Sequence, residues 1–426
     1  MNNFERYHDA INFLEGLSNL PIKEDYMAKQ RHLGVYLKRM RYFLTLIGNP
    51  DRGMKYIHIT GTAGKGTVTN MVHEILNVSG KKVGSFTSPF VTTSIEKIKV
   101  GDLYISPGTL ADIVEYLKPF IDKAYLEGPY GRPSYFEIFL AIAFLYFKQE
   151  KCEWVVLEVG LGGRYDATNV IEKSIATAIT MIDYDHTYVL GKTLKKIAKD
   201  KAGIIKRGSK FFTAEQRPKL LKIFKEICME KGAKFHQIPE QSNYQEYNKA
   251  LAMAITESIG IPRKYIEKGI EQAHLQCRFE IIRKNPLVVL DGAHNRSKIR
   301  STIVNLKNLK FRKLHLIIGL AENKDEALIL DQIIPHADKV YTTRFQIKDR
   351  KCAHPKELAG RSRKYLKENV IIETFLDPIE ALKKALSQVK KNDLVLVAGS
   401  FFLAGEIRKK WFTETRILKR RKSFIS

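Results

Sequence analysis

The sequence is poor in cysteine and has no long apolar segment. Its four cysteines are far apart and form no CxxC pair: Cys152, Cys228, Cys277 and Cys352. We therefore expect reduced thiols and neither a metal cage nor a disulfide framework. The longest uninterrupted apolar run is residues 138–147, which is much shorter than a bilayer span and predicts a buried helix instead. No secretory signal is visible, so we expect a cytoplasmic protein without a membrane partner.

Acidic residues are in the minority. Lysine and arginine total 72 against 46 aspartates and glutamates, which gives a formal net charge of +26. This balance suits nucleic acid, but it equally suits small anionic ligands. The basic residues are spread along the chain without an RNA-binding signature, and the only dense cluster, residues 419–422, is interpreted as a solvated tail. We therefore expect small anions as ligands and no nucleic acid.

Short apolar runs alternate with helical patterns along the chain, which indicates a mostly parallel sheet covered by helices on both faces. Strands are expected at residues 56–59, 83–87, 154–159 and 175–182, and helices at 67–78 and 136–147. The pattern restarts after about residue 275, with strands expected at 287–290, 314–318, 339–342 and 394–397. We predict an α/β protein: a P-loop-type, mostly parallel sheet domain at 1–275, followed by a smaller Rossmann-like α/β domain at 276–426.

A glycine-rich loop follows the first expected strand and consists of Gly61, Thr62, Ala63, Gly64, Lys65, Gly66 and Thr67. In such a loop, backbone N–H groups turn toward a phosphate chain and the following helix adds partial positive charge. Lys65 could reach the terminal phosphates, and Thr67 could meet Mg²⁺. A strict Walker loop has Ser or Thr directly after the lysine, whereas Gly66 intervenes here. The alternative is a tight glycine turn without a ligand.

Three further residues follow expected strands or open a helix end. Glu158 ends an apolar strand before several glycines, and burying its charge would be costly without a cation such as Mg²⁺. The alternative is a surface carboxylate at a strand end. His186 follows the next strand and could ligate a metal, although a lone histidine is usually structural. Lys201, taken alone, is one lysine among many, and the alternative to a role in the site is a surface salt bridge on the helix expected at 194–201.

Taken together, these motifs resemble the Mur ligase superfamily, and within it the folylpolyglutamate synthase/dihydrofolate synthase family. The matching stretches occur in family order: GTAGKGT (61–67), TSP (87–89), SYFE (134–137), LEVGLGGRYDATN (157–169), DHTYVLGKTLKKIAKDKAGIIKRG (185–208), RFE (278–280), DGAHN (291–295) and GSFFLAGEIR (399–408). They cover about residues 55–408. The combination of the LEVGLGGRYDATN and DGAHN stretches is the most specific part of the resemblance.

The resemblance implies an ATP site with two Mg²⁺ ions. The loop residues Gly61, Thr62, Gly64, Lys65, Gly66 and Thr67 would hold the phosphates, with Thr67 beside a metal. Ser88 and Glu158 would ligate one Mg²⁺, and Glu158 and His186 would ligate the second. Lys201 matches the lysine that is carbamylated in this family, whose adduct would support the second metal.

The remaining roles that the resemblance implies come mainly from the C-terminal half. Asn248 matches a residue that touches adenine, and Arg278 matches a phosphate-contacting arginine. Asp291 and His294 would lie near the ribose and the incoming amino acid. Ser400 matches a glutamate-binding position.

By this resemblance the protein is an ATP-dependent carboxylate–amine ligase with catalytic residues Lys65, Glu158, His186 and Lys201. It would add L-glutamate to folate or dihydropteroate through an acyl phosphate, and it is expected to be monomeric. A related Mur-type ligase acting on another carboxylate is the first alternative. A basic nucleic-acid-binding ATPase is the second, and it would show DNA-stimulated ATP hydrolysis and a steep salt dependence.

The chain departs from the family pattern at four places. Ala63 stands where Asn is common, and Phe90 stands where His commonly follows the TSP stretch. Residues 91–98 are a loose version of an Asn-Glu-Arg-Ile pattern, and Gln276-Cys277 replaces Pro-Gly. The phosphate and metal positions are preserved, so the changes fall on the pterin side of the expected site.

Overall fold

The computed structural model describes residues 2–17, 34–322, 325–347 and 351–424. The chain forms two compact units. The first comprises Met1–Phe90, Ser94–His274 and Arg420–Ser426, and the second comprises Val91–Thr93 and Leu275–Lys419. The expected ranges, 1–275 and 276–426, therefore differ from these units at three places: Val91–Thr93 and Leu275 belong to the second unit, and Arg420–Ser426 belongs to the first.

The first unit is built on an eight-stranded sheet. In spatial order its strands are β4 (Leu103–Tyr104), β3 (Ile98–Val100), β2 (Val83–Phe86), β5 (Trp154–Glu158), β1 (Lys55–Thr60), β6 (Ala176–Ile179), β7 (Lys210–Thr213) and β8 (Lys234–Gln237). The six strands from β2 to β8 in this order are parallel, and β3 and β4 add an antiparallel edge. The predicted mostly parallel sheet is confirmed.

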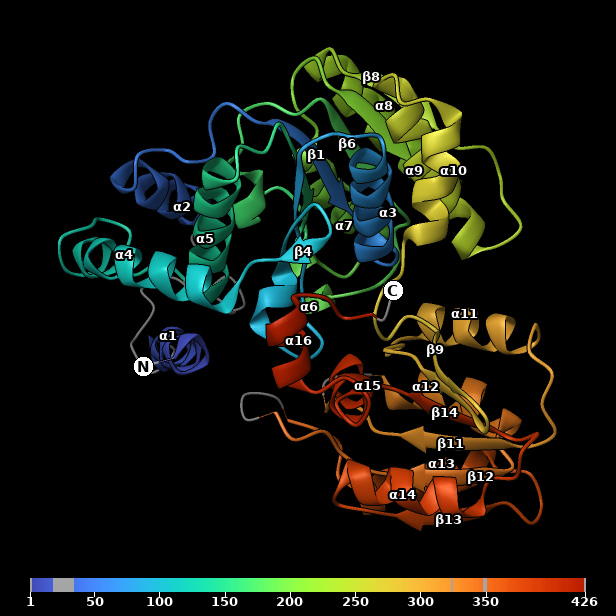
Figure 1. The fold of residues 1–426 in the computed structure, drawn as a ribbon. Coiled ribbons are helices and arrows are strands. Elements are labelled where there is room, and N and C mark those ends of the chain that lie inside the picture. The colour runs from blue at the N-terminus through green and yellow to red at the C-terminus, as the bar shows by residue number, and fades with distance from the viewer. Residues whose placement is uncertain (1, 18–33, 323–324, 348–350, 425–426) are drawn as a thin grey trace. The chain divides into compact units, whose positions relative to one another are not determined.

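Ten α-helices accompany this sheet among the described residues. They are α1 (Asn3–Gly16), α2 (Val35–Leu46), α3 (Lys65–Val78), α4 (Pro107–Leu126), α5 (Tyr135–Gln149), α6 (Thr187–Leu190), α7 (Leu194–Lys201), α8 (Pro218–Lys231), α9 (Tyr244–Ser258) and α10 (Arg263–Gln272). The described part of this unit also contains three short 3₁₀ helices: η2 (Ser94–Lys97), η3 (Ala167–Val170) and η4 (Ala202–Ile204). Figure 1 shows α3, α9 and α10 grouped beside one face of the sheet.

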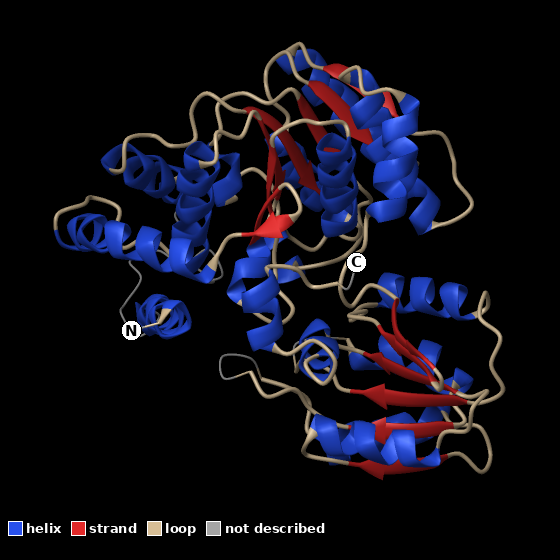
Figure 2. Cartoon of the chain, viewed as in Figure 1, coloured by secondary structure: helices blue, strands red, loops and turns tan. Residues whose placement is uncertain are grey.

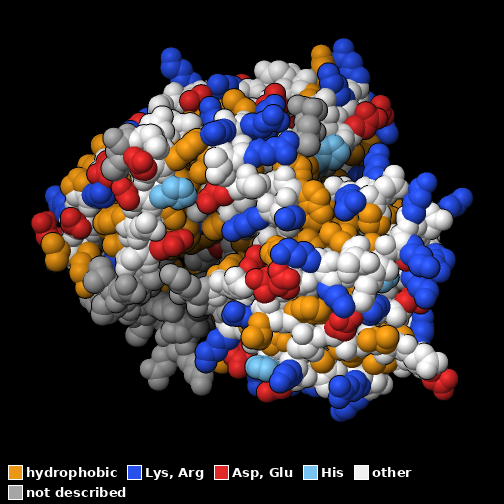
Figure 3. Space-filling view, turned by 60° about the horizontal axis from the view of Figure 1, so that its bottom comes forward, with side chains coloured by type: hydrophobic (Ala, Val, Ile, Leu, Met, Phe, Trp, Pro, Cys, Tyr) orange, Lys and Arg blue, Asp and Glu red, His pale blue; other side chains and the backbone are white. Residues whose placement is uncertain are grey.

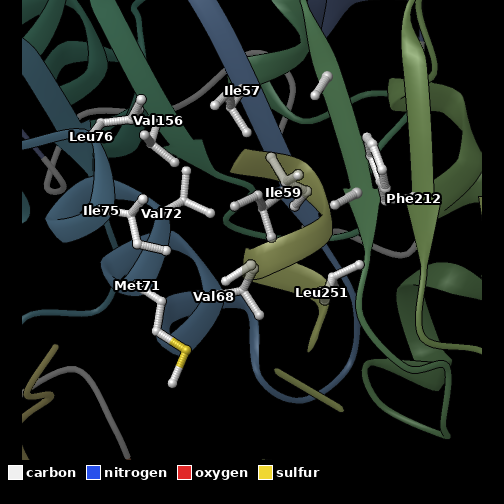
Figure 4. Close-up of a cluster of buried hydrophobic side chains, with 14 of the residues drawn as sticks. Ile57, Ile59, Val68, Met71, Val72, Ile75, Leu76, Val156, Phe212 and Leu251 are labelled. Carbon is white, nitrogen blue, oxygen red and sulfur yellow. The ribbon is translucent and has the colours of Figure 1, made fainter. Parts of the chain in front are cut away.

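The apolar side chains of α3 anchor it to the central strands. Val68, Val72 and Ile75 recur at helical spacing and are fully buried. They pack toward Ile57 and Ile59 of β1 in one continuous cluster (Figure 4). Because α3 begins where the glycine-rich loop ends, this packing fixes the loop relative to the sheet.

The second unit is a six-stranded sheet with helices on both faces (Figure 2). Its strand order is β13 (Ile371–Thr374), β12 (Lys339–Thr342), β11 (Leu314–Ile318), β14 (Leu394–Ala398), β10 (Leu287–Leu290) and β9 (Glu280–Lys284). All neighbouring pairs are parallel except β9 with β10. Its helices are α11 (Arg296–Leu306), α12 (Glu326–Ile333), α13 (Pro355–Ser362), α14 (Pro378–Gln388), α15 (Phe401–Arg408) and α16 (Glu414–Arg420). The predicted smaller α/β domain is confirmed as a fold.

The basic C-terminal segment is not a solvated tail, so that prediction is wrong. The Arg421 guanidinium donates to the Tyr104 carbonyl at 2.6 Å and to the Tyr146 hydroxyl at 3.2 Å. Buried Ser423 donates its hydroxyl proton to Glu96 at 2.5 Å. Of the residues in this cluster, only Lys419 and Arg420 are exposed, as the prediction required. The segment is therefore an ordered part of the first unit.

No helix in the described parts of the chain is both long enough and apolar enough to cross a membrane.

Candidate functional site

Three neighbouring parallel strands bring the expected site residues of the first unit to one edge of the sheet. β1 lies between β5 and β6, and Ile59 pairs in register with Glu158 on one side and with Ala178 on the other. The glycine-rich loop leaves the end of β1, and Glu158 is the last residue of β5. The carboxyl edge of a parallel sheet is where α/β proteins place ligands.

Two glycines of the loop hold conformations and contacts that exclude a side chain. Gly64 has φ +84°, and a Cβ there would lie 2.3 Å from Asn248 Oδ1. A Cβ on Gly61 would lie 1.8 Å from Thr180 Oγ1, whose hydroxyl donates to the Ala63 carbonyl at 2.5 Å. The loop therefore packs against α9 and against Thr180, the residue that follows β6. Asn248 is brought directly against the loop, as its expected nucleotide-contacting role requires.

Gly66 makes room for the carboxylate of Glu158. A Cβ on Gly66 would lie 3.3 Å from both Glu158 oxygens, closer than most real Cβ contacts. Glu158 is only 5% exposed, and one oxygen accepts the backbone N–H of Ser88 at 3.1 Å. The departure from the strict Walker pattern therefore has a structural reason, because a serine or threonine at position 66 would crowd this carboxylate. Ser88 and Glu158, expected to share a metal, do lie together.

Two lysines converge on one backbone carbonyl of the loop. Lys65 Nζ donates to the Gly61 carbonyl at 3.0 Å, and Lys201 Nζ donates to the same oxygen at 2.9 Å. Burial, together with the nearby positive charge of Lys65, lowers the pKa of Lys201 to about 7. The alternative that Lys201 forms a surface salt bridge is wrong, because its side chain is buried.

The glycines after Glu158 hold the end of α7, which carries Lys201. A Cβ on Gly163 would lie 2.6 Å from the Lys201 carbonyl oxygen, and one on Gly203 would lie 2.5 Å from the Arg164 Cα. The Arg164 N–H donates to the Asp200 carbonyl at 2.9 Å. Residues 157–169 and the segment around Lys201 are therefore two halves of one closely packed support for the lysine.

A buried polar chain behind this support was not predicted from the sequence. Asp166 accepts the N–H of Leu161 at 2.9 Å and both the N–H and the hydroxyl of Thr168. Burial raises the pKa of Asp166, and these hydrogen bonds oppose the rise. The Thr168 oxygen lies 2.8 Å from Nε2 of the fully buried His58. Asp166 belongs to the family-like DATN stretch, which was the available sequence indication, whereas nothing around His58 marked it.

His186 lies in an unusual backbone conformation at the start of α6. Its φ is +48°, and its side chain is 41% exposed. The imidazole Nε2 lies 3.8 Å from Asp185 Oδ1, and the His186 N–H donates to the same oxygen at 3.1 Å. Across the described residues, no three or more His, Cys, Asp or Glu side chains are grouped so as to hold a metal. The second expected metal pair, Glu158 with His186, therefore stays a prediction.

In the second unit the expected residues also gather at a sheet edge. β10 and β14 are adjacent and parallel, so the residues after them meet. The Gly399 N–H donates to the Ala293 carbonyl at 2.9 Å and joins the two strand ends. This contact brings the DGAHN stretch and Ser400 to the same edge.

Asp291 is a buried carboxylate held in place by its own domain. It accepts the Thr302 hydroxyl at 2.7 Å and the Ala293 N–H at 3.1 Å. Burial raises the pKa of Asp291 to about 6, and the positive charge of Arg278 is among the influences that lower it. The Arg278 guanidinium lies 4.9 Å from the centre of the Phe401 ring.

His294 and Ser400 both make hydrogen bonds within their own unit. His294 Nδ1 lies 2.8 Å from the Gly292 carbonyl, and Nε2 lies 3.1 Å from the Lys298 ammonium. These partners fit a neutral imidazole with its proton on Nδ1. The Ser400 oxygen accepts backbone N–H groups at 3.2 and 3.4 Å as the N-cap of α15. Ser400 therefore has a structural role at the helix start.

A largely buried ion pair near this edge was also missed. The Arg408 guanidinium makes three contacts of 2.8–3.0 Å with Glu280, and Glu280 also accepts the Cys277 N–H at 2.9 Å. The RFE and GEIR stretches contain these two residues, which were recognised only as parts of motifs. The pair ties the strand after Arg278 to α15, which begins at the Ser400 cap.

Known proteins match the chain over nearly its whole length. Residues 277–401 match the Mur ligase glutamate ligase domain family. The dihydrofolate synthase/folylpolyglutamate synthase of Bacillus subtilis is 29% identical over 448 residues, which cover 96% of this chain and 99% of that protein. The crystal structure of folylpolyglutamate synthase from Thermotoga maritima is 30% identical, covers 96% of this chain and 98% of its own, and has a TM-score of 0.80.

A further solved structure has ligands in place. The bifunctional folylpolyglutamate synthase/dihydrofolate synthase of Yersinia pestis, with Mn, AMPPNP and L-glutamate bound, is 25% identical. It covers 95% of this chain and 98% of its own, with a TM-score of 0.78. The resemblance seen in the sequence is thereby confirmed over both units, and the chain belongs to the folylpolyglutamate synthase/dihydrofolate synthase family.

Proposed function

We propose that this protein is an ATP-dependent ligase that joins L-glutamate to the carboxylate of a folate or of dihydropteroate, releasing ADP and phosphate. The observation that carries the proposal is the geometry at the end of β1. There Lys65 and Lys201 converge on the Gly61 carbonyl, and Glu158 lies against Gly66. Family membership gives this phosphate-type loop its chemistry, because the relatives named above are glutamate-adding synthases.

The first unit would bind ATP. The loop from Gly61 to Thr67 presents backbone N–H groups at the start of α3, where the helix end favours a phosphate. Lys65 would move from the Gly61 carbonyl to the terminal phosphates. Asn248 would contact adenine, which its position against Gly64 supports.

The chain's donor set fits a divalent cation. Glu158 is buried, one of its oxygens accepts the Ser88 N–H, and a cation would offset the cost of burying its charge. Ser88 and Thr67 would supply hydroxyl oxygens, and His186 would supply an imidazole to a second ion. When bound, Mg²⁺ supplies positive charge that stabilises the phosphoryl group during transfer. The Yersinia pestis relative with Mn and AMPPNP supports a metal and a nucleotide in this family.

Lys201 would act as a carbamate. The free amine attacks CO₂ and loses a proton, which forms an N–C bond and converts a cation into a carboxylate. This reaction needs a neutral amine, and a pKa of about 7 provides a substantial neutral fraction at physiological pH. The carbamate would then no longer repel a metal or the ammonium of Lys65.

The second unit would bind the incoming glutamate. Arg278 would contact phosphate, and Asp291 would meet the ribose. His294 and Ser400 would contact glutamate, from the edge where β10 and β14 end. In this assignment the first unit is the ATP-binding domain and the second is the glutamate-ligase domain.

The reaction would pass through an acyl phosphate. A carboxylate is a poor electrophile, so one of its oxygens first takes the γ-phosphoryl group from ATP and ADP leaves. The glutamate amine then attacks the carbonyl carbon, and the C–O bond to phosphate breaks. Lys65 would offset the negative charge that moves onto ADP in the first step.

A turnover assay tests the proposal. ATP hydrolysis is measured across a panel of acids, namely dihydropteroate, folate and a peptidoglycan precursor, each with and without L-glutamate. We expect ADP formation only when a pterin acid and L-glutamate are both present. Turnover with the peptidoglycan precursor alone would assign the protein to a different Mur-type ligase. Turnover stimulated by DNA without either substrate would contradict the ligase. Gel filtration of the active protein tests the further proposal that it is a monomer.

A further inference from the structure

Lys97 is a nearly buried cation that the mechanism above does not use. It ends η2, directly before β3, and is 5% exposed. Its backbone carbonyl accepts the N–H of Thr87 at 2.9 Å. The next residue, Ser88, donates its N–H to Glu158. Lys97 is therefore anchored beside the segment that borders the expected reaction centre.

Aromatic rings surround the ammonium of Lys97. Its Nζ lies 3.8 Å from the ring centre of Phe139, 4.2 Å from that of Tyr135 and 5.2 Å from that of Phe90. Two of the departures from the family pattern meet here, since Phe90 replaces the common His and Lys97 lies in the segment that only loosely follows the Asn-Glu-Arg-Ile pattern. The two unusual residues form one local site.

The rings do not satisfy this cation. An ammonium has three N–H donors, whereas ring faces offer only a diffuse attraction. In the described part of the chain, the Lys97 ammonium makes no hydrogen bond or ion pair. Burial lowers its pKa to about 7, and only the exposed Glu15 of α1 opposes this change. Tyr135 cannot serve as a counter-ion, because burial raises the pKa of its hydroxyl to about 12.

A buried charge without a hydrogen-bond partner is costly and is typical of functional sites. A ligand that suits this one needs an anionic oxygen for the ammonium and an aromatic body for the surrounding rings. A carboxylate on or near a benzene ring has both features. Among the substrates of the proposed reaction, dihydropteroate carries its carboxylate directly on a benzene ring. In ATP the ribose separates the aromatic base from the phosphates, and glutamate has no ring.

We propose that Lys97, with Phe90, Tyr135 and Phe139, binds the carboxylate end of the aromatic acid acceptor and so selects that acceptor. This inference rests on the proposed function. In this assignment Lys97 contacts the acceptor directly, and the three rings position Lys97 and the acceptor. Its loss would weaken acceptor binding without changing the affinity for ATP.

A binding experiment on the full-length protein tests the assignment, with pteroate and its carboxamide as probes. Calorimetry is run on the wild type, Lys97→Met, Lys97→Arg and the control Lys81→Met, which removes the same charge from an exposed position of the same unit. For Lys97→Met we expect pteroate affinity to fall about tenfold and carboxamide affinity to change by less than about twofold, since only pteroate carries the charge. Lys97→Arg should retain the preference for pteroate, and Lys81→Met should match the wild type.

If Lys97→Met weakens the binding of pteroate and of the carboxamide equally, Lys97 contributes packing and not a contact with the carboxylate. If it weakens neither, Lys97 does not contact the acceptor. Either result overturns the inference. If Lys97→Met does not fold, the wild type is titrated with pH. Pteroate affinity should then fall as pH rises above about 7 and the amine loses its charge, while carboxamide affinity stays flat. A flat response for pteroate overturns the inference. Glutamate-dependent turnover of the wild type is measured first, because its absence would instead refute the proposed function.

Discussion

At the scale of single residues, the site depends on what two positions lack as much as on what others carry. Gly64 and Gly66 have no side chain, and the space is used by Asn248 and by Glu158 respectively. The carboxylate of Glu158 can therefore lie close to the loop, because no side chain at position 66 separates the two. A variant Walker loop and a strand-end glutamate are thus two parts of one arrangement.

Replacing Glu158 by Gln tests the metal role of this carboxylate. The amide keeps the shape and can still accept the Ser88 N–H, but it lacks the charge that would hold Mg²⁺. We expect kcat to fall by about 100-fold or more, as for loss of a preorganised charged group, while the melting temperature stays close to that of the wild type. The matched control is Glu153→Gln on the same segment, which is exposed and pairs with Lys55. Near-normal kcat for Glu158→Gln at saturating Mg²⁺ would rule out the metal role.

Replacing Lys201 by Ala tests the carbamate. We expect weak activity that small carboxylates such as acetate partly restore, because they can occupy the vacated space and supply the missing negative charge. The exposed Lys199→Ala in the same helix is the control and should be fully active with no response to acetate, since an exposed charge contributes only about 0–1 kcal/mol. A Lys201→Ala protein that acetate leaves unchanged would count against carbamylation. Mass spectrometry cannot replace this assay, since carbamates are lost in acid.

At the scale of helices and strands, the sequence predicted most of the central strands but missed the interior strand β7 and the edge strands. The strands expected at 314–318 and 339–342 match β11 and β12 residue for residue. Buried strands of a parallel sheet are often continuous apolar runs, so they can be recognised from the local sequence. β8, with three of its four residues exposed, and the two-residue β4 carry no such run, and only their partner strands define them.

The same distinction holds within the site. Motif spacing placed Lys65, Glu158 and the DGAHN stretch at strand ends, because the ends of parallel strands share an edge. It could not show that Lys201 and Lys65 share a carbonyl, or that Asn248 lies against Gly64. Those contacts join residues far apart in the chain and depend on how helices pack on the sheet.

The C-terminal segment shows the largest difference between sequence and structure at this scale. Truncation after Arg420 removes the Arg421 contacts with Tyr104 and Tyr146 and leaves buried Glu96 without the Ser423 hydroxyl. We expect a loss of about 1–3 kcal/mol in the free energy of unfolding, because a buried acceptor loses one of its hydrogen bonds. Denaturant melts of the truncated and full-length proteins provide the measurement. Lys419→Ala, at an exposed position, is the control. Identical melts would restore the interpretation as a solvated tail.

At the scale of the whole molecule, the excess of 26 positive charges fits the substrates better than a polymer partner. In the view of Figure 3, Lys and Arg side chains lie at many separate places among other residues. ATP, folate and glutamate are all anions, and each added glutamate makes the product more anionic. A general positive field favours the approach of such ligands without any one strong site.

The central claim is that a carboxylate is activated by phosphorylation before glutamate attacks it. The most direct test uses an acceptor whose carboxylate oxygens are both ¹⁸O, with unlabelled ATP and L-glutamate. In the proposed reaction one acceptor oxygen becomes the bridge of the acyl phosphate and leaves with the phosphate when the amine attacks. We predict that the phosphate released carries one ¹⁸O for each amide formed. Phosphate without ¹⁸O, released in step with the amide product, would contradict the acyl phosphate and the account built on it.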